Sequence, residues 1–254
     1  MNDGTRGPKA ALVTGAARRI GLCVARRLAQ DGYAVALHCS ENSLPETEAT
    51  ARALTDEGCR AAALAADLAD ASAVERLVAA AAARVGPLSL LVNNASVFAA
   101  DSAADFGVGQ WDRIFAVNLR APCALARNFA AQARPGASIV NIVDQRVLRP
   151  TPQFFSYTLS KSALWTATRT MAQSFAPLGL RVNAVGPGPV APNGPQGGEG
   201  FSQEVSGLLL PGPVEADEIA EAVLYLARAR HVTGEMLAVD CGQHLAWATP
   251  DVVL

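Results

Sequence analysis

Apolar residues along the chain follow two alternating spacings. Short apolar runs of strand length are separated by longer stretches in which apolar residues recur with a helical period, as at Ile20, Val24 and Leu28. Strands are predicted at residues 10–14, 34–38, 60–65, 88–94, 137–143, 180–185 and 235–240. Helices are predicted at 19–32, 44–57, 70–85, 155–175 and 215–227, with two more between Gly109 and Ala133. Strands that alternate with helices predict a parallel sheet covered on both faces.

This pattern predicts an α/β fold, in which residues 1–254 form one doubly wound domain with a parallel sheet of about seven strands. Such sheets bind ligands beyond the carboxyl ends of their strands. Thr14, Asn93, Asp144 and Gly186 fall near those ends, so the sequence places the site there.

One segment, residues 186–213, is rich in glycine and proline and shows no clear period. It is either a loose surface loop or a lid over the site. Its position after a strand at the ligand edge favours the lid, because long loops in compact domains are usually lids or disordered.

Composition narrows the class of protein. The chain has 254 residues, is 50% hydrophobic and carries 21 basic and 23 acidic side chains without a basic patch, so one large core is expected and no nucleic-acid partner. It has no apolar run long enough for a membrane span and no signal-peptide pattern at its start. Five scattered cysteines are read as free thiols of a cytoplasmic protein, and three histidines argue against a zinc site.

The turn after the first strand reads TGAARRIG, from Thr14 to Gly21. Gly15 permits a tight turn and Gly21 permits close packing of the next helix on the strand. The helix start presents free N–H groups and the positive end of its dipole, which suit a pyrophosphate.

The second strand indicates which dinucleotide binds. It ends His38–Cys39–Ser40, without the acidic residue that would bind the ribose hydroxyls of NAD. Arg18 and Arg19 supply positive charge suited to a 2′-phosphate. NADPH is therefore predicted, although Glu41 lies nearby. A solvated helix start remains the alternative for the arginines, and a hydrogen-bonded strand-end residue the alternative for His38.

Tyr157 and Lys161 are four residues apart and so share one face of a predicted helix. An ammonium beside a phenol favours the phenolate, so Lys161 is expected to lower the pKa of Tyr157 and make it a usable proton donor. A surface pair on an exposed helix is the alternative.

These motifs resemble the short-chain dehydrogenases/reductases over nearly the whole chain. The matching stretches are TGAARRIG, Asp67–Leu68, NNAS (93–96), Asn118 in WDRIFAVNL, YTLSK (157–161), RVNAVGPG (181–188) and TGEMLAVDCG (233–242). The resemblance implies a Rossmann-like fold, hydride transfer from a nicotinamide cofactor, and a homotetramer in which the helix at 155–175 helps to form an interface.

It also implies roles for individual residues. Asn118 would hold a proton-relay water, and Lys161 would bind the nicotinamide ribose as well as tune Tyr157. The expected cofactor-binding residues are Thr14, Gly15, Arg18, Arg19, Ile20, Gly21, His38, Ser40, Asp67, Leu68, Asn94, Ala95, Ser96, Tyr157, Lys161, Pro187 and Gly188.

Asp144 departs from the pattern of the family. Most members have a serine at this position, thirteen residues before the tyrosine, whose hydroxyl donates to a substrate carbonyl oxygen. An ionised carboxylate cannot donate and would repel the oxyanion of a reduced ketone. Asp144 suits a substrate with basic nitrogens: it can accept from ring N–H groups or, if protonated in an apolar pocket, donate to an imine nitrogen.

This aspartate resembles the pteridine reductase and dihydromonapterin reductase branch of the family. That branch also implies that Arg19 faces the pterin and the cofactor phosphates, that Ser96 touches ligand and cofactor, and that Phe98 stacks on the pterin ring. Core packing is the alternative for Phe98. Two features differ from the branch. The stretch Asp144–Gln145–Arg146 and the LRPTPQFF that follows it do not match the branch, and Arg146 could neutralise Asp144; Cys241 stands where the family usually has glycine.

The prediction is an NADPH-dependent reductase of a C=N bond in a pteridine-like small molecule. Asp144, Tyr157, Lys161 and Asn118 would be catalytic. Arg19, Ser96, Phe98, Asp144 and Tyr157 would bind the substrate. A carbonyl reductase of unknown substrate and a non-catalytic NADP(H)-binding regulatory protein remain alternatives; the intact Asn118–Tyr157–Lys161 set argues against the latter.

Overall fold

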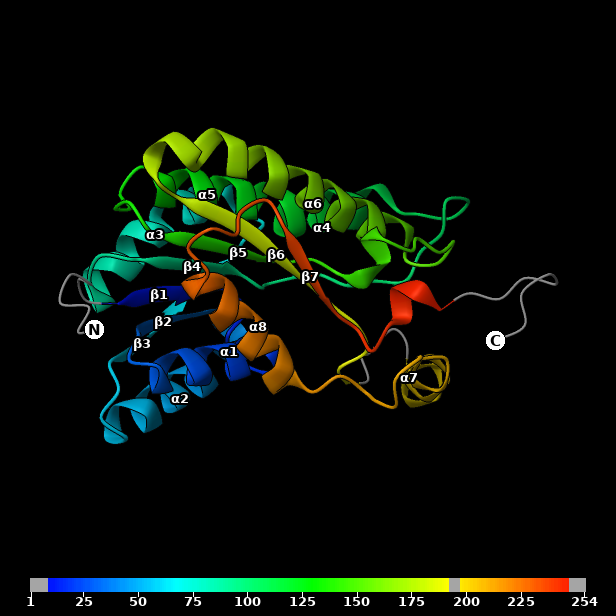
Figure 1. Cartoon of the computed structure of the whole chain (residues 1–254), viewed down its shortest axis with the longest axis horizontal. Helices are drawn as coiled ribbons and strands as arrows, with labels where there is room; N and C mark the ends of the chain where they lie inside the picture. Colours follow the sequence, from blue (N-terminus) through cyan, green and yellow to red (C-terminus); the bar gives the residue numbers. More distant parts are fainter. Residues whose placement is uncertain (1–8, 192–196, 247–254) are drawn as a thin grey trace.

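Seven parallel strands form one sheet in the computed structural model, which describes residues 9–191 and 197–246. The strands are β1 (Ala10–Val13), β2 (Ala34–Cys39), β3 (Ala61–Ala65), β4 (Leu90–Asn93), β5 (Ser138–Ile142), β6 (Arg181–Pro187) and β7 (Met236–Val239). Their order is β3-β2-β1-β4-β5-β6-β7, and every neighbouring pair is parallel (Figure 1). The predicted doubly wound, single-domain Rossmann-like fold is confirmed.

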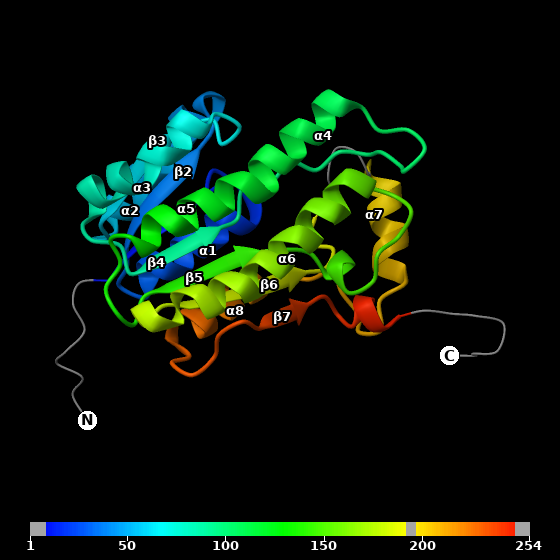
Figure 2. The same ribbon diagram turned by 90° about the horizontal axis from the view of Figure 1, so that it is seen from above.

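Helices cover both faces of the sheet (Figures 1 and 2). They are α1 (Arg19–Gln30), α2 (Leu44–Asp56), α3 (Ala71–Val85), α4 (Val108–Phe115), α5 (Ala121–Ala130), α6 (Phe155–Phe175), α7 (Gly197–Ser206) and α8 (Ala216–Arg228). Helices α1, α2 and α8 pack on one face, and α3, α5 and α6 on the other.

The first strand shows why the sheet strands are apolar at every position. Ala11 and Val13 belong to the core under α1 and α8, whereas Ala10 and Leu12 belong to the core under α3 and α5. Successive side chains of a strand point to opposite faces, so a sheet covered on both sides needs apolar residues throughout. All four residues are at most 1% exposed.

Sequence periodicity missed the helix inside the segment 186–213. Strand β6 continues to Pro187, and α7 occupies residues 197–206, while residues 192–196 lie outside the described part. Figure 2 shows α7 at the same end of the molecule as the short 3-10 helix η5 (Gln243–Leu245). The segment therefore brings a helix to the carboxyl edge of the sheet instead of being irregular throughout.

Cys241 has a left-handed backbone with φ of 52°. This conformation favours glycine, because only glycine lacks the Cβ that crowds it. The glycine usual in the family at this position thus has a local conformational reason.

No helix among the described residues is both long and apolar enough to cross a bilayer.

Candidate active site

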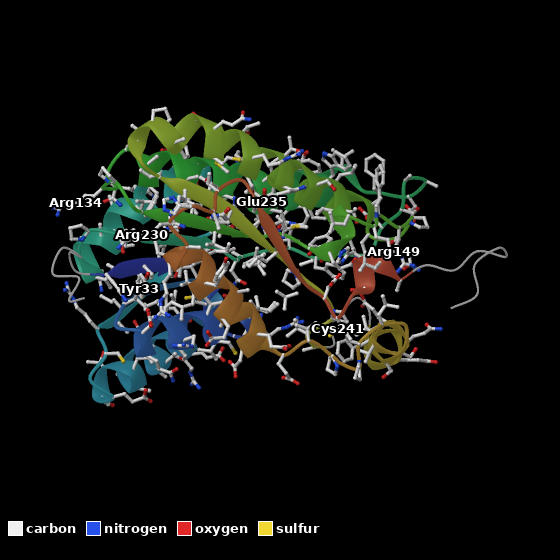
Figure 3. All side chains as sticks on the ribbon, viewed as in Figure 1. Tyr33, Arg134, Arg149, Arg230, Glu235 and Cys241 are labelled. Carbon is white, nitrogen blue, oxygen red and sulfur yellow. The ribbon has the colours of Figure 1, made fainter. Side chains whose placement is uncertain are left out.

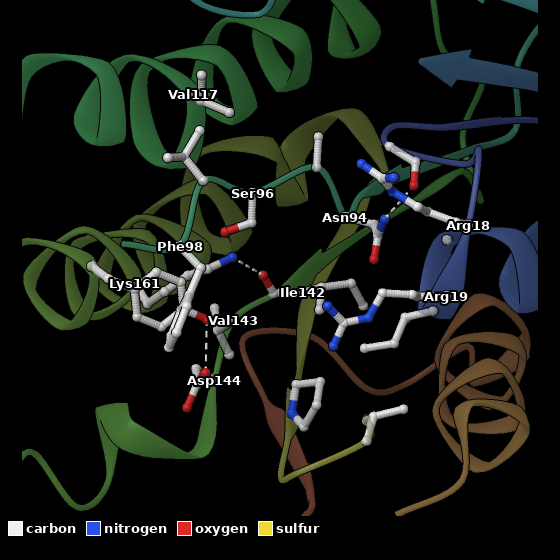
Figure 4. A pocket seen from close by; sticks show the side chains of 18 of the residues that line it. Arg18, Arg19, Asn94, Ser96, Phe98, Val117, Ile142, Val143, Asp144 and Lys161 are labelled. Carbon is white, nitrogen blue, oxygen red and sulfur yellow. Dashed lines mark hydrogen bonds between the residues drawn. The ribbon is translucent and has the colours of Figure 1, made fainter. Parts of the chain in front are cut away.

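A cavity of about 510 Å³ opens at the carboxyl ends of the strands (Figure 4), a volume typical of ligand sites. It lies where β2 and β4 diverge on either side of β1, the topological switch point of the sheet. The predicted site residues that line it are Gly15, Arg18, Arg19, Ile20, Gly21, His38, Ser40, Asp67, Leu68, Asn94, Ala95, Ser96, Phe98, Asp144, Tyr157, Lys161, Pro187 and Gly188. Thr14 and Asn118 are the two predicted residues that the cavity lining does not include.

The glycine turn after β1 is tight enough to require both glycines. Gly15 has a φ of +65°, and a Cβ on Gly21 would lie 2.1 Å from the carbonyl oxygen of Gly15 and 2.5 Å from Nδ2 of Asn94. The start of α1 therefore packs directly on the turn, which leaves its first N–H groups facing the cavity edge.

Thr14 holds this turn against the loop after β4. Its hydroxyl accepts from the backbone N–H groups of Asn94 (2.9 Å) and Ala95 (3.0 Å). The Asn94 side chain donates to the carbonyl oxygens of Thr14 (2.9 Å) and Gly15 (3.0 Å). Thr14 is 1% exposed, so it positions two cavity walls instead of lining them.

His38 lies at the end of β2 with both ring nitrogens engaged by the protein. Its Nδ1 accepts from the N–H of Gly15 at 3.2 Å, and its Nε2 donates to the carbonyl of Ala66 at 3.2 Å. Burial lowers the pKa of His38 to about 4, so the ring is neutral at pH 7. His38 is therefore a hydrogen-bonded strand-end residue, which was the alternative to a cofactor-binding role, and it also lies in the wall of the cavity.

The charges at this end of the cavity suit an anion. The side chains of Arg18 and Arg19 are exposed at the cavity rim, and Ser40 and Ser43 add hydroxyl groups. Glu41, which the sequence placed near the same site, is exposed and is not part of the lining. No carboxylate of the second strand therefore faces the position where NAD would need one.

Arg19 also links the turn to the segment after β6. Its Nη2 donates to the carbonyl of Ala191 at 3.0 Å, and its backbone takes a left-handed φ of 54°. Figure 4 shows its guanidinium directed into the cavity. A non-glycine residue in this conformation is uncommon and occurs often at ligand sites.

Asn118 lies in a five-residue π-helical turn, Ala116–Arg120, between α4 and α5. Pro122 has no N–H for the carbonyl four residues earlier, that of Asn118, so the regular pattern is interrupted there. The Asn118 side chain accepts from the N–H of Val97 (2.8 Å) and donates to the carbonyl of Val97 (2.9 Å) and to Oγ of Ser160 (3.1 Å). It ties the loop after β4 to α6 while being fully buried.

Asp144, Tyr157 and Lys161 all line the cavity, and Figure 4 shows Asp144 and Lys161 on the same side of it. The Tyr157 hydroxyl donates to Oδ2 of Asp144 at 2.7 Å, and the Asp144 Oδ1 accepts from the N–H of Arg146 at 2.8 Å. The Lys161 ammonium donates to the carbonyl of Ile142 at 2.8 Å and lies 5.7 Å from the centre of the Tyr157 ring. Tyr157 is 6% and Lys161 2% exposed, so the alternative of a surface pair is wrong.

The expected lowering of the Tyr157 pKa is also wrong for this structure. Burial, followed by the charge of Asp144 and its hydrogen bond, raises the pKa of Tyr157 well above its usual value. Burial likewise raises the pKa of Asp144 and lowers the pKa of Lys161 to about 8. Sequence spacing identified the lysine but could not show that desolvation and a neighbouring carboxylate outweigh it.

Phe98 forms one wall beside the catalytic pair. Its ring centre lies 4.4 Å from that of Phe154 and 4.6 Å from that of Tyr157, the latter in an edge-on arrangement. Phe154 has a left-handed φ of 56° at the start of α6, which is strained for an aromatic residue. Phe98 is thus packed against protein rings and still lines the cavity.

Arg146 does not form an ion pair with Asp144. Its guanidinium donates to Oγ1 of Thr151 at 3.0 Å, lies 3.5 Å from the carboxylate of Glu204 and stacks 5.1 Å from the centre of the Phe154 ring. Its charge still acts at a distance to lower the pKa of Asp144, but less than burial raises it.

Several cavity residues were not singled out from the sequence: Ser43, Arg113, Gln145, Phe201, Glu204 and Gln243. Gln145 could have been found from its place directly after Asp144. Phe201 and Glu204 lie in the segment predicted as a lid, and Gln243 follows the last strand, but no sequence pattern singled out these individual residues.

A dinucleotide-type sheet with a buried Tyr–Lys pair at its carboxyl edge defines a class of oxidoreductases. The family model described as Enoyl-(Acyl carrier protein) reductase matches residues 15–244. The chain belongs to the short-chain dehydrogenase/reductase family.

Individual relatives span almost the full chain. A crystal structure of FolM alternative dihydrofolate reductase 1 from Brucella canis, complexed with NADP, is 47% identical, covers 96% of this chain and 97% of its own, and superposes with a TM-score of 0.91. An uncharacterized oxidoreductase of Methylorubrum extorquens is 35% identical over 92% of this chain and 97% of its own length. The 3beta-hydroxysteroid dehydrogenase 1 of Eggerthella lenta is 34% identical over 96% and 97%.

Proposed function

We propose that the protein is an NADPH-dependent reductase of a C=N bond in a pteridine-like heterocycle. The observation that carries the proposal is the hydrogen bond between Tyr157 and Asp144 in a desolvated pocket walled by Phe98. A carboxyl group in this place recognises ring N–H groups or, when protonated, an imine nitrogen. The likeness to the Brucella canis FolM structure supports the same substrate class.

The cavity suits NADPH in shape and charge. The glycine turn brings backbone and helix start to its edge without side chains in between, and Arg18, Ser40 and Ser43 offer donors to a 2′-phosphate. His38, Asp67, Leu68, Asn94 and Ala95 would enclose the adenosine half, and Lys161, Pro187 and Gly188 the nicotinamide half. NADP bound to the Brucella canis relative supports this choice.

When bound, the nicotinamide supplies the hydride. The chain supplies the proton that the nitrogen of the C=N bond requires. Because burial keeps Tyr157 protonated, its hydroxyl is an acid that is hydrogen-bonded to Asp144 Oδ2, and both residues line the cavity. The buried ammonium of Lys161 stabilises the charge that develops on the phenol.

Phe98 and Arg19 would hold the ring of the substrate near the Tyr157 hydroxyl. Phe98 offers an aromatic face or edge for stacking, and Ser96 adds a hydroxyl whose Oγ lies 3.3 Å from Oδ1 of Asn118. Asn118 positions the loop that carries Ser96 and Phe98, and it would also hold the proton-relay water that the family implies.

Residues 186–213 are proposed as the lid of this site. Phe201 and Glu204 of α7 line the cavity, and Glu204 connects the helix to Arg146 and Gln243.

We also propose a cytoplasmic homotetramer. All five cysteines are free thiols, and the exposed Phe106 contacts Trp111 and Phe155 in an aromatic group at the start of α6.

A carbonyl reductase is the second candidate, because relatives such as the Eggerthella lenta steroid dehydrogenase act on other substrates by name. The test is NADPH oxidation by the purified protein with 7,8-dihydropterins, quinonoid dihydropterins, biopterin and a panel of ketones. Turnover of a pterin in preference to every ketone supports the proposal, and turnover of ketones alone contradicts it. Tight NADPH binding without turnover on either panel would support the regulatory alternative.

A further inference from the structure

The helix that carries Tyr157 begins without a cap of its own. Phe154, at the N-cap position of α6, has a left-handed φ of 56° and offers no side-chain hydrogen bond to the helix. This conformation is strained for an aromatic residue, and the first N–H groups of a helix have no partner within it. Another part of the chain must therefore accept from these N–H groups and hold the turn in place.

Asp101, on the loop after β4, supplies these acceptors. Its backbone carbonyl accepts from the N–H groups of Phe154 at 3.0 Å and Phe155 at 3.5 Å. Its carboxylate accepts from the N–H of Ser156 at 3.1 Å and from the Ser156 hydroxyl, and Ser156 is fully buried. A carboxylate at this place also complements the positive end of the helix dipole. One residue from outside the helix therefore accepts from three consecutive N–H groups at its start.

The same loop carries Phe98, three residues before Asp101. The ring centre of Phe98 lies 4.4 Å from that of Phe154 and 4.6 Å from that of Tyr157. Without the carboxylate, the loop after β4 and the start of α6 can move relative to each other. The contacts that such a movement changes are the packing of Phe98 on Tyr157 and the hydrogen bond from Tyr157 to Asp144.

We propose that Asp101 is a positioning residue for the proton donor: it fixes the start of α6 so that the Tyr157 hydroxyl keeps its place beside Asp144. This inference rests on the role of Tyr157 in the proposed function, but not on which ring is reduced. Asp101 does not line the cavity of about 510 Å³ that Tyr157 lines, so it acts through α6. The orientation of a proton donor matters steeply, because a misplacement on the order of 1 Å can slow a reaction about a hundredfold.

Asp101→Ala tests this role by steady-state kinetics with NADPH and a quinonoid dihydropterin. The variant should lose about ten- to a hundredfold in kcat, because the proton donor is misaligned, and change the KM for NADPH by less than about twofold. Asp101→Asn keeps an oxygen that can accept from the N–H of Ser156, and it should retain most of the wild-type kcat. Asp105→Ala, at an exposed aspartate of the same loop, is the matched control and should resemble the wild type.

A second measurement is independent of turnover. The chain has three tyrosines, Tyr33, Tyr157 and Tyr225. Protein labelled with 3-fluorotyrosine therefore gives one fluorine resonance for each, and Tyr157→Phe assigns that of Tyr157. Asp101→Ala should shift the Tyr157 resonance and leave that of Tyr33 in place. Figure 3 shows Tyr33 at the opposite end of the molecule from Arg149, which belongs to the loop after β5.

Thermal melting of each variant checks folding, and all measurements are made well below the melting temperature. If Asp101→Ala does not fold, Ser156→Ala takes its place: it removes one hydrogen bond to the carboxylate and should lower kcat several-fold and shift the same resonance. A folded variant of this kind with the kcat of the wild type, or with an unshifted Tyr157 resonance, would overturn the role of Asp101. If the wild type reduces no dihydropterin, the proposed function fails, and the Tyr157 resonance alone decides whether Asp101 positions this residue.

Discussion

The hydroxyl of Tyr157 donates a 2.7 Å hydrogen bond to Oδ2 of Asp144. In a carbonyl-reducing member of the family a serine hydroxyl at the place of Asp144 would donate to substrate, whereas this carboxyl accepts from the catalytic phenol itself. The proton donor and the group that recognises the substrate are therefore one hydrogen-bonded unit. The burial of the Tyr157–Asp144 pair and the residues around it determine how the stability and the activity of the protein should respond to substitution and to pH.

Asp144→Asn should raise the free energy of unfolding relative to the wild type, and this difference should grow as the pH rises. Burial raises the pKa of Asp144 in the folded state, so the folded protein binds this proton more tightly than the unfolded chain. The free energy of unfolding of the wild type therefore decreases as the pH rises from about 4, the pKa of the unfolded chain, through the pKa of the folded state. The decrease is roughly 1.4 kcal/mol for each tenfold difference in proton affinity between the two states. An uncharged asparagine side chain avoids this loss.

Melting curves between pH 4 and pH 7 measure this effect. The melting temperature of Asp144→Asn minus that of the wild type should increase over this range. Asp112→Asn, at an exposed residue of α4, removes one surface charge and serves as the control. A difference that stays constant with pH, or that decreases, contradicts a desolvated carboxyl.

Activity should fall as the pH rises through about 8. Burial lowers the pKa of Lys161 to about 8, so the ammonium that stabilises the developing phenolate is lost above that pH. The limiting decrease in kcat/KM is about tenfold per pH unit. The pH–rate profile with saturating NADPH checks this, and Lys161→Met should be much less active and lack this limb. A wild-type profile that stays flat to about pH 10 is incompatible with the role given to Lys161.

Arg18 should distinguish NADPH from NADH. Arg18 is exposed and lines the same cavity as Ser40, and a charge-assisted hydrogen bond to a 2′-phosphate contributes about 1.5–3 kcal/mol. Arg18→Ala should raise the KM for NADPH about tenfold or more and leave that for NADH nearly unchanged. Arg52→Ala, at an exposed arginine of α2, is the control. An equal effect on both cofactors would mean that Arg18 does not contact the 2′ position.

Glu204 should hold α7 over the site. Its carboxylate bonds Gln243 and pairs with Arg146, and the paired side chains of Arg146 and Glu204 are only 11% and 18% exposed. Glu204→Ala should raise the substrate KM several-fold, since a partly buried charged hydrogen bond contributes about 1–3 kcal/mol. It should also speed proteolysis within residues 197–206. Glu199→Ala, exposed on the same helix, should change neither; equal behaviour of the two variants contradicts the role of Glu204 in holding α7.

The sheet was predictable because its signal is local. Every predicted strand is present, with ends that differ by at most two residues, since a sheet buried on both faces leaves uninterrupted apolar runs such as residues 88–94 around β4. Asp70, the first residue of the helix predicted at 70–85, caps α3, because its Oδ1 accepts from the N–H of Ser72 at 2.8 Å. Helix α7 was missed because no period marks it in a segment rich in glycine and proline.

The candidate site was predictable in membership but not in electrostatics. The strand-end rule and the motif spacing identified the glycine turn, Asp144, Tyr157 and Lys161, and the resemblance to the family supplied most of the other cavity residues that were predicted. The sequence could not show that Tyr157 is buried against Asp144, which reverses the expected direction of its pKa. Nor could it show that Gln145 and Gln243, far apart in the chain, line the same cavity, because that depends on how η5 packs beside the loop after β5.

The most direct test of the central claim exchanges Asp144 for the serine usual in the family. Rates of NADPH oxidation would be measured for wild type and Asp144→Ser with one dihydropterin and one small ketone, at equal and saturating NADPH. The claim that Asp144 recognises ring nitrogen predicts loss of at least about a hundredfold in kcat/KM for the dihydropterin, the effect of about 2.7 kcal/mol, and no comparable loss for the ketone. Two results would contradict this claim. In one, the Asp144→Ser variant still reduces the dihydropterin; in the other, the wild type reduces only the ketone, and Asp144→Ser reduces that ketone faster.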